Sequence, residues 1–162
     1  MNRQERRRQA KAAAKSLPAV APPASQYSAQ IDAMMHAAVA HHRAGRPSEA
    51  ATLYRSVLAT QPDHPDAHHL LGVIALQSGR ISDAERQIRH AIGLRSNDGQ
   101  YWNNLGVVLK RTGRFVDALD AYRQAIRWAP QSSAHWANFV DCSRLARINA
   151  HDQDLCATVL AC

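Results

Sequence analysis

The chain has 162 residues, which is enough for one domain and a tail, and its formal net charge is +7. No apolar run approaches the roughly 18 residues of a membrane span, which argues against a membrane-spanning protein. Three cysteines without a CxxC spacing predict thiols in a reducing compartment, and they argue against a fold held by disulfides or cysteine-bound metal.

Residues 1–16 are predicted to form a basic arm. Six of the first 15 residues are Lys or Arg and one is Glu, so most of the net charge lies here. The segment lacks the apolar stretch of a secretory signal, and we therefore expect a cytoplasmic protein. The arm can attract nucleic acid or an anionic surface nonspecifically. The alternative is a solvated, partly helical arm that aids solubility.

Residues 17–30 are predicted to be a Pro/Ala-rich linker. Pro18, Pro22 and Pro23 interrupt helices, and the Ala and Ser residues around them offer little to bury. This composition favours a semi-extended chain between the arm and the regularly patterned remainder.

A repeat of 34 residues begins after the linker. Its units are 31–64, 65–98, 99–132 and a half-repeat, 133–148. The second and third units are identical at ten positions, among them Gly72 and Gly106, whereas the first unit matches more weakly. Self-similarity at this period is typical of stacked helix pairs.

The units resemble the tetratricopeptide repeat family, whose pattern combines an aromatic residue, Leu-Gly, alanines, a second aromatic residue and a closing proline. The third unit carries this pattern as Trp102, Leu105-Gly106, Leu109, Ala118, Tyr122, Ala125 and Pro130. The resemblance implies an all-α fold, namely a right-handed α-solenoid of helix-turn-helix repeats. It also implies that the small residues Gly106 and Ala118 let the two helices of a unit approach closely.

Glycines, prolines and periodicity predict the helix boundaries. Gly45, Gly79 and Gly113 are expected in turns with positive φ, and Pro62 and Pro130 are expected to end helices. The predicted helices are 31–44, 47–60, 65–78, 81–94, 99–112, 115–128 and 133–147. Residues 149–162 are predicted to form a further capping or truncated helix, capped by Asp152.

The resemblance implies a concave groove that is lined by the first helix of each unit and binds a peptide or protein segment. The candidate groove residues are Asn103, Asn104, Val107, Lys110, Arg111, Asn138, Asp141, Arg144, His69, Val73 and Gln77. Asn104 and Asn138 share one repeat position, and an amide there supplies both donor and acceptor to an extended peptide backbone. This is similar to the N-terminal repeats of protein O-linked N-acetylglucosamine transferases and their bacterial relatives. The series is incomplete because Leu70 occupies the position in the second unit, and the alternative is that Asn104 only caps or hydrates a helix face.

No catalytic site, metal or cofactor is expected. The chain has no glycine-rich phosphate loop, nucleophile elbow or paired-carboxylate pattern. His64 and His68 have a spacing that can chelate a metal, but no carboxylate or cysteine completes the set with His69. Trp102, Trp128 and Trp136 are assigned to packing positions of the repeat.

The sequence therefore predicts a non-enzymatic adaptor that binds a protein or peptide segment. A clamp for chaperone tails is not expected, because Met35, Val39 and Leu70 occupy three of its positions. The alternative is the substrate-recruiting front part of a bacterial glycosyltransferase, methyltransferase or sulfotransferase, because residues 135–162 resemble the junction to such a domain. A third, weaker alternative is an RNA- or ribosome-associated factor acting through the arm. The sequence does not specify the oligomeric state.

Overall fold

The structure, a computed structural model, describes residues 24–160, with the side chains of residues 26–147. The predicted basic arm and the first part of the predicted linker lie outside the described residues. The chain divides into two compact units, Met1–Ala33 and Met34–Cys162. The helix α2 begins in the first unit and ends in the second, and every other helix lies in the second.

Helices account for nearly all of residues 24–160, and no strand occurs among them. The helices are α2 (Ala24–Arg43), α3 (Pro47–Thr60), α4 (Pro65–Gln77), α5 (Ile81–Leu94), α6 (Gly99–Arg111), α7 (Phe115–Trp128) and α8 (Ser133–Leu160). Helices α3 to α7 start at their predicted residues and end within one residue of the predicted ends. None of the helices in this part of the chain is long and apolar enough to cross a membrane.

Helix α2 begins at Ala24, earlier than the predicted start at residue 31. The last part of the predicted linker is therefore helical rather than semi-extended. The physical reason is that Pro23 is the last proline of this region, and the residues that follow it include neither glycine nor proline until Gly45.

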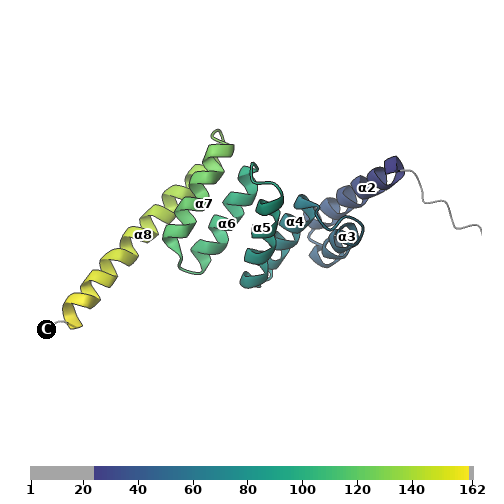
Figure 1. Cartoon of the computed structure of the whole chain (residues 1–162). Helices are drawn as coiled ribbons and strands as arrows, with labels where there is room; N and C mark the ends of the chain where they lie inside the picture. The colour runs from purple at the N-terminus through teal and green to yellow at the C-terminus, as the bar shows by residue number, and fades with distance from the viewer. Residues whose placement is uncertain (1–23, 161–162) are drawn as a thin grey trace, which may run out of the picture. The chain divides into compact units, whose positions relative to one another are not determined.

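The helices from α3 onward pack as successive hairpins in chain order. Helix α4 packs on α5 and α6 packs on α7, and these two hairpins lie side by side in Figure 1. Helix α5 also contacts α6, α3 contacts α4, and α8 contacts both α7 and α6. The first helix of a repeat is called helix A (α2, α4, α6 and α8), and the second is called helix B (α3, α5 and α7).

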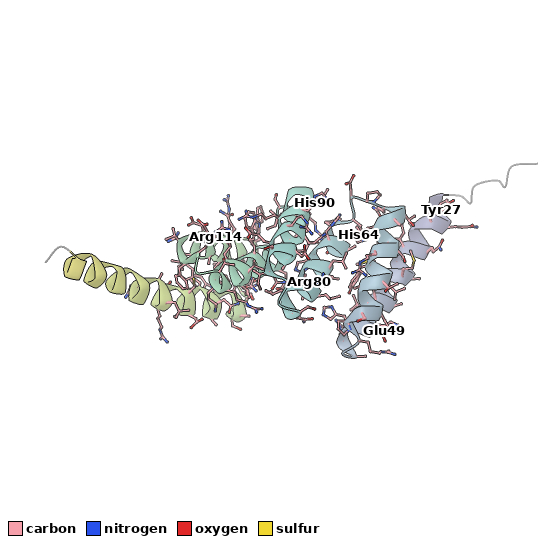
Figure 2. All side chains as sticks on the ribbon, turned by 90° about the horizontal axis from the view of Figure 1, so that it is seen from below. Tyr27, Glu49, His64, Arg80, His90 and Arg114 are labelled. Carbon is pink, nitrogen blue, oxygen red and sulfur yellow. The ribbon has the colours of Figure 1, made fainter. Side chains whose placement is uncertain are left out.

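The turn from helix A to helix B is the same in three repeats. Its glycines are Gly45, Gly79 and Gly113, with φ of +71°, +74° and +75°. The positive φ confirms the prediction, because this backbone conformation is easiest for glycine. After Gly113, the N–H of Arg114 donates back across the helix end to the carbonyl of Leu109 at 3.0 Å. Figure 2 labels Arg114 and its counterpart Arg80, each of which directly follows a turn glycine.

Helices A and B of the third repeat approach closely at Gly106. A Cβ atom on this glycine would lie 2.5 Å from the ring of Tyr122, which is fully buried on α7. In the second repeat, a Cβ on Gly72 would lie 2.7 Å from the side chain of Ile88. The close approach predicted for Gly106 is confirmed, and it explains why a helix interior accepts a residue that costs about 1 kcal/mol relative to alanine.

Helix α8 is continuous over 28 residues, whereas two helices were predicted, with a break after residue 147. That prediction is wrong. The position equivalent to Gly79 and Gly113 is occupied in α8 by Arg147, one repeat after Gly113. Without a glycine in the turn, the helix continues beyond this point and Asp152 lies inside it rather than at a cap.

A ring N–H near the start of helix A binds the preceding inter-repeat turn. The pairs are His68 Nε2 with the Pro62 carbonyl (2.8 Å), Trp102 Nε1 with the Ser96 carbonyl (2.7 Å) and Trp136 Nε1 with the Pro130 carbonyl (2.9 Å). Each donor lies six residues after its acceptor. The same repeat position therefore fixes the junction between consecutive repeats three times.

The three tryptophans differ in burial. Trp102 is half-buried against the hydrophobic core, but Trp136 is 48% exposed and Trp128 is 44% exposed. The assignment to a packing position is confirmed for Trp102, and Trp136 also holds its repeat junction through Nε1, although the rings of Trp136 and Trp128 are partly accessible to solvent.

Candidate functional site

The predicted groove residues lie on helices α4, α6 and α8. These are consecutive A helices, and α4 contacts α6 as α6 contacts α8. The surface that they share is called the A-helix face. Because equivalent residues recur every 34 positions in sequence, the A-helix face presents similar side chains at regular steps.

Polar side chains connect neighbouring A helices across this face. The Nδ2 of Asn104 donates to Nε2 of His69 at 2.8 Å, and the Nδ2 of Asn138 donates to Oδ1 of Asn103 at 2.9 Å. In both pairs the partners are 35 residues apart, whereas the repeat is 34 residues long. Each asparagine therefore binds the residue next to its own equivalent in the preceding repeat. Asn104 and Asn138, which were predicted to form a series along the groove, are therefore each hydrogen-bonded to an adjacent A helix.

Burial divides the predicted groove residues into two groups. Asn103 and His69 are each only 8% exposed, so the prediction that they face the groove is wrong. Their side chains are covered because each accepts a hydrogen bond from the next A helix. Asn104 and Asn138 remain half-buried, with access to solvent.

The two half-buried asparagines keep hydrogen-bonding capacity. A side-chain amide has two N–H groups and a carbonyl oxygen with two lone pairs. Among the described residues, one N–H of Asn104 and one of Asn138 are used by neighbouring side chains. The oxygen and the second N–H of each amide have no hydrogen-bond partner among the described residues.

The imidazole of His69 is kept neutral by its surroundings. Burial lowers its pKa from 6.5 to about 4, although the negative charges of Asp98 and Asp66 oppose this shift. The ring stacks at a tilt on Tyr101, with centroids 4.5 Å apart. A neutral ring has a free lone pair, so Nε2 of His69 is an acceptor for Asn104 at neutral pH.

One end of the A-helix face is basic. The Nζ of Lys110 lies 2.7 Å from Asp141, and the hydrogen bond from Lys110 lowers the pKa of this carboxyl. Arg111 donates to the carbonyl of Leu76 on the neighbouring A helix at 2.9 Å and is exposed, as is Arg144. These cations lie near the C-terminal ends of α6 and of the first half of α8.

The remaining candidates contribute apolar and polar surface. Val73 and Val107 occupy equivalent positions on α4 and α6 and are half-buried. Gln77 is exposed at the end of α4, where its Oε1 accepts a hydrogen bond from His42 at 3.0 Å. This bond joins the first and second repeats with the same 35-residue offset as the asparagine pairs.

A cluster at the opposite end of the A-helix face was not predicted. The hydroxyl of Tyr101 donates to Asp66 at 2.5 Å, and Arg95 binds both of these residues. Burial, followed by the hydrogen bond to Asp66, raises the pKa of Tyr101. The signal in the sequence was a tyrosine in α6 that lies 35 residues after an aspartate in α4, the same offset as the other pairs.

No group of three His, Cys, Asp or Glu side chains among the described residues is arranged to hold a metal ion. Each histidine near residue 64 has another role. His64, labelled in Figure 2, caps α4 by accepting from the N–H of Ala67 at 3.3 Å. His68 binds the preceding turn, and its Nδ1 lies 2.7 Å from the amide of Gln87. His69 is bound by Asn104.

Comparison with known proteins identifies the repeats. Three family models, each described as a tetratricopeptide repeat, match residues 3–65, 41–106 and 99–132. The chain belongs to the tetratricopeptide repeat family. The model that matches residues 3–65 extends into the segment predicted as a basic arm. None of the curated proteins compared with the sequence is a significant match.

Solved structures with tetratricopeptide repeats are similar to the chain. An O-GlcNAc transferase from Thermobaculum terrenum is 25% identical, with a TM-score of 0.70 and 72% of this chain covered. The chain spans 22% of that transferase's length. The Sgt2 domain from Aspergillus fumigatus has a TM-score of 0.68 at 19% identity, covering 76% of this chain and 82% of that one. The first such domain of Spaghetti (RPAP3), bound to an HSP90 peptide, has a TM-score of 0.68 at 13% identity, covering 72% and 93%.

Proposed function

We propose that this protein is a non-catalytic cytoplasmic adaptor whose A-helix face binds an extended segment of another protein. The observation that carries the proposal is the pair of solvent-accessible amides, Asn104 and Asn138, one repeat apart on neighbouring A helices. An extended peptide offers alternating N–H and C=O groups, and a side-chain amide can bind either of them without regard to sequence.

Other groups on the face support selectivity. Val73 and Val107 add half-buried apolar surface beside the asparagines, which suits an apolar side chain of the bound segment. Arg111 and Arg144 are exposed at the basic end and favour an acidic side chain there. The Spaghetti domain, which is bound to an HSP90 peptide, is a precedent for peptide binding by this fold.

The test is a pull-down from native lysate, followed by titration of the recovered segment. The variant Asn104→Ala/Asn138→Ala removes both amides and should weaken binding about tenfold, because each lost hydrogen bond contributes about 0.5–1.5 kcal/mol. The melting temperature should fall modestly, because each change also removes an inter-helix hydrogen bond to the buried His69 or Asn103. Affinities are therefore compared at a temperature at which circular dichroism shows both proteins to be folded.

A matched control removes two amides elsewhere. Asn97 and Gln131 are exposed in the turns that precede α6 and α8, outside the A-helix face. The variant Asn97→Ala/Gln131→Ala should bind the segment as the unaltered chain does. Equal affinities for all three proteins would refute binding through the asparagines.

A second candidate function is favoured by the similarity to the Thermobaculum transferase. At 25% identity over a region that is 22% of that protein, the chain would correspond to a segment that recruits substrates for a catalytic domain outside it. This function uses the same A-helix face, with the acceptor protein as the bound segment. The genomic locus provides the test: a transferase sequence in frame after residue 162 supports this candidate, and an unrelated neighbouring gene favours the adaptor.

A further inference from the structure

A second surface of the array lies on the side of the B helices, apart from the A-helix face. A hollow of about 390 Å³ there is lined mainly by α6 and α7, with Arg89 of α5, and it is called the second groove. Its buried or half-buried apolar lining consists of Trp102, Leu105, Leu109 and Ala121. The volume lies within the range of ligand pockets, about 300–1,000 Å³.

The same hollow recurs one repeat earlier. Each of the nine residues that line the second groove has an equivalent 34 positions before it, and these equivalents line two adjoining hollows of about 170 and 420 Å³. The two hollows share Arg86 and Gln87, and together they are called the first groove. Figure 2 labels Arg80 and His90, which line the first groove toward opposite ends of α5. Because Arg89 lines both grooves, they form one continuous surface from α3 to α7.

The first groove has an excess of positive charge. Apart from its histidines, its ionisable lining residues are Arg55, Arg80, Arg86, Arg89 and Asp83. Two of these arginines bind Asp83, at 3.5 and 2.5 Å, and Arg89 binds Glu85 at 2.9 Å. Arg55 is exposed and forms no ion pair with any described residue. The first groove therefore attracts a negatively charged ligand.

The second groove is balanced in charge and more apolar. Asp120 stands where the first groove has Arg86, so the second groove is lined by two arginines and two aspartates. Arg114 binds Asp117 at 2.7 Å. Trp102 places an indole ring where the first groove has an imidazole. An apolar side chain therefore suits the second groove better than an anion does.

These charges disfavour two other occupants. Every nucleotide of a nucleic acid carries a phosphate, which Asp117 and Asp120 would repel from the second groove. Residues 1–15 of the chain itself contain six Lys or Arg and one Glu, so the first groove would repel them. A segment of another protein with acidic residues at one end and an apolar residue at the other meets neither difficulty.

We propose that the two grooves bind such a segment of a partner protein. Its acidic side chains lie in the first groove against Arg55 and Arg86, and its apolar side chain lies in the second groove against Trp102. This site is separate from the A-helix face and does not depend on the function proposed for that face. The protein would then connect two segments, one on each side of the array.

Fluorescence anisotropy of labelled peptides with the full chain tests the proposal. The probes are two peptides of six glutamates and two leucines, with the leucines at either end. One of them should bind, and more weakly as salt is added, because salt screens the charges. Arg55→Glu/Arg86→Glu should weaken binding about tenfold. The matched control, Arg43→Glu/Arg127→Glu, changes the net charge equally at exposed residues outside both grooves and should retain most of the binding.

The emission of Trp102 tests where the apolar end lies. The chain has three tryptophans, so Trp128→Phe/Trp136→Phe leaves Trp102 as its sole indole. The peptide that binds should change this emission, because its leucines cover the ring. Replacing the leucines by serines should weaken binding about tenfold and leave the emission unchanged. Circular dichroism establishes that each variant is folded.

Several outcomes would overturn the proposal. Neither peptide binding at about 1 mM, or equal losses in the two charge-reversed variants, would show that the first groove has no specific site for acidic side chains. Binding of oligouridine instead of the peptides, with loss in Arg55→Glu/Arg86→Glu, would make the surface a nucleic-acid site. Peptide binding that is lost in Asn104→Ala/Asn138→Ala but kept in the arginine variant would place the segment on the A-helix face, which refutes this site and supports the other.

Discussion

The third repeat and the incomplete fourth repeat begin with similar A helices but bury them to different extents. In the third, Gly106 lies beneath Tyr122 and Gly113 turns the chain back. In the fourth, Val140 is half-exposed and Arg147 lets the helix continue. A small residue in mid-helix thus occurs together with a turn glycine. These two positions therefore serve a single event, the return of helix B over helix A.

The first repeat agrees with this interpretation. Its residue at the position of Gly106 is Ala38, which is fully buried, and its turn carries Gly45 with positive φ.

Removing the Tyr122 ring should produce the largest loss of stability. Tyr122→Ala empties the site above Gly106 and should cost about 3–5 kcal/mol, the usual range for truncating a large buried aromatic residue. Thermal unfolding followed by circular dichroism measures the effect, which should be a drop of roughly 10 °C. Trp128→Ala is the control, and because this ring is 44% exposed it should cost less than about 1 kcal/mol. Similar losses in the two variants would contradict the description of the closed repeat.

The pH dependence of stability should distinguish the pair His69–Asn104 from the pair Asn103–Asn138 on the A-helix face. The pKa of His69 is about 4 in the folded chain and 6.5 without the fold, so unfolding takes up a proton between these values. Stability should therefore fall as the pH is lowered through this window, by about 2 kcal/mol between pH 7 and pH 5. Urea unfolding at both pH values measures it. His69→Gln keeps an acceptor for Asn104 but does not titrate, and it should lose this part of the slope. The hydrogen-bonded pair Asn103–Asn138 contains no group that titrates in this range and should not contribute to the slope.

A larger side chain at the close contact should destabilise the third repeat but have little effect at the equivalent position of α8. Gly106→Leu forces Tyr122 away and should destabilise the chain by about 1–3 kcal/mol. Val140→Leu, one repeat later, enlarges an exposed residue and should change stability by less than about 0.5 kcal/mol. The melting temperatures of the two variants check this difference. An unchanged melting temperature for Gly106→Leu would exclude the close approach.

The turn positions should show the smallest contrast. Gly113→Ala places a Cβ in a left-handed backbone conformation and should cost about 1 kcal/mol. Arg147→Ala lies in a continuous helix and should be neutral or slightly stabilising, because alanine is the better helix former. The midpoints of denaturant unfolding measure the stabilities of the two variants. A loss at residue 147 as large as that at residue 113 would indicate a turn in α8.

Local sequence signals predicted most of the fold because they act within one repeat. Gly79 and Gly113 mark turns, and the spacing from Gly106 to Tyr122 marks a helix pair whatever surrounds it. The continuity of α8 was missed because it depends on what is absent, a glycine at residue 147. The early start of α2 was missed because the prolines were weighed more heavily than the helix-compatible residues after them.

The site was predicted less well than the fold, since it depends on contacts between repeats. Asn104 and Asn138 were placed correctly on A helices, but their partners are offset by 35 residues rather than 34. That offset buries Asn103 and His69, and no pattern within one unit reveals it. It follows from the angle at which successive helices pack, which is a property of the stacked array.

The ring N–H bonds to the inter-repeat turns give the protein built-in optical probes. Trp102 reports the junction between the second and third repeats, and Trp136 reports the junction between the third repeat and α8. Indole fluorescence depends on the hydrogen bond and the solvent around the ring. Loss of one junction should therefore change the emission of the tryptophan at that junction. With Trp128 replaced by Phe, two variants that each keep one of the remaining indoles report separately on the fraying of α8 and on the opening of the closed repeats.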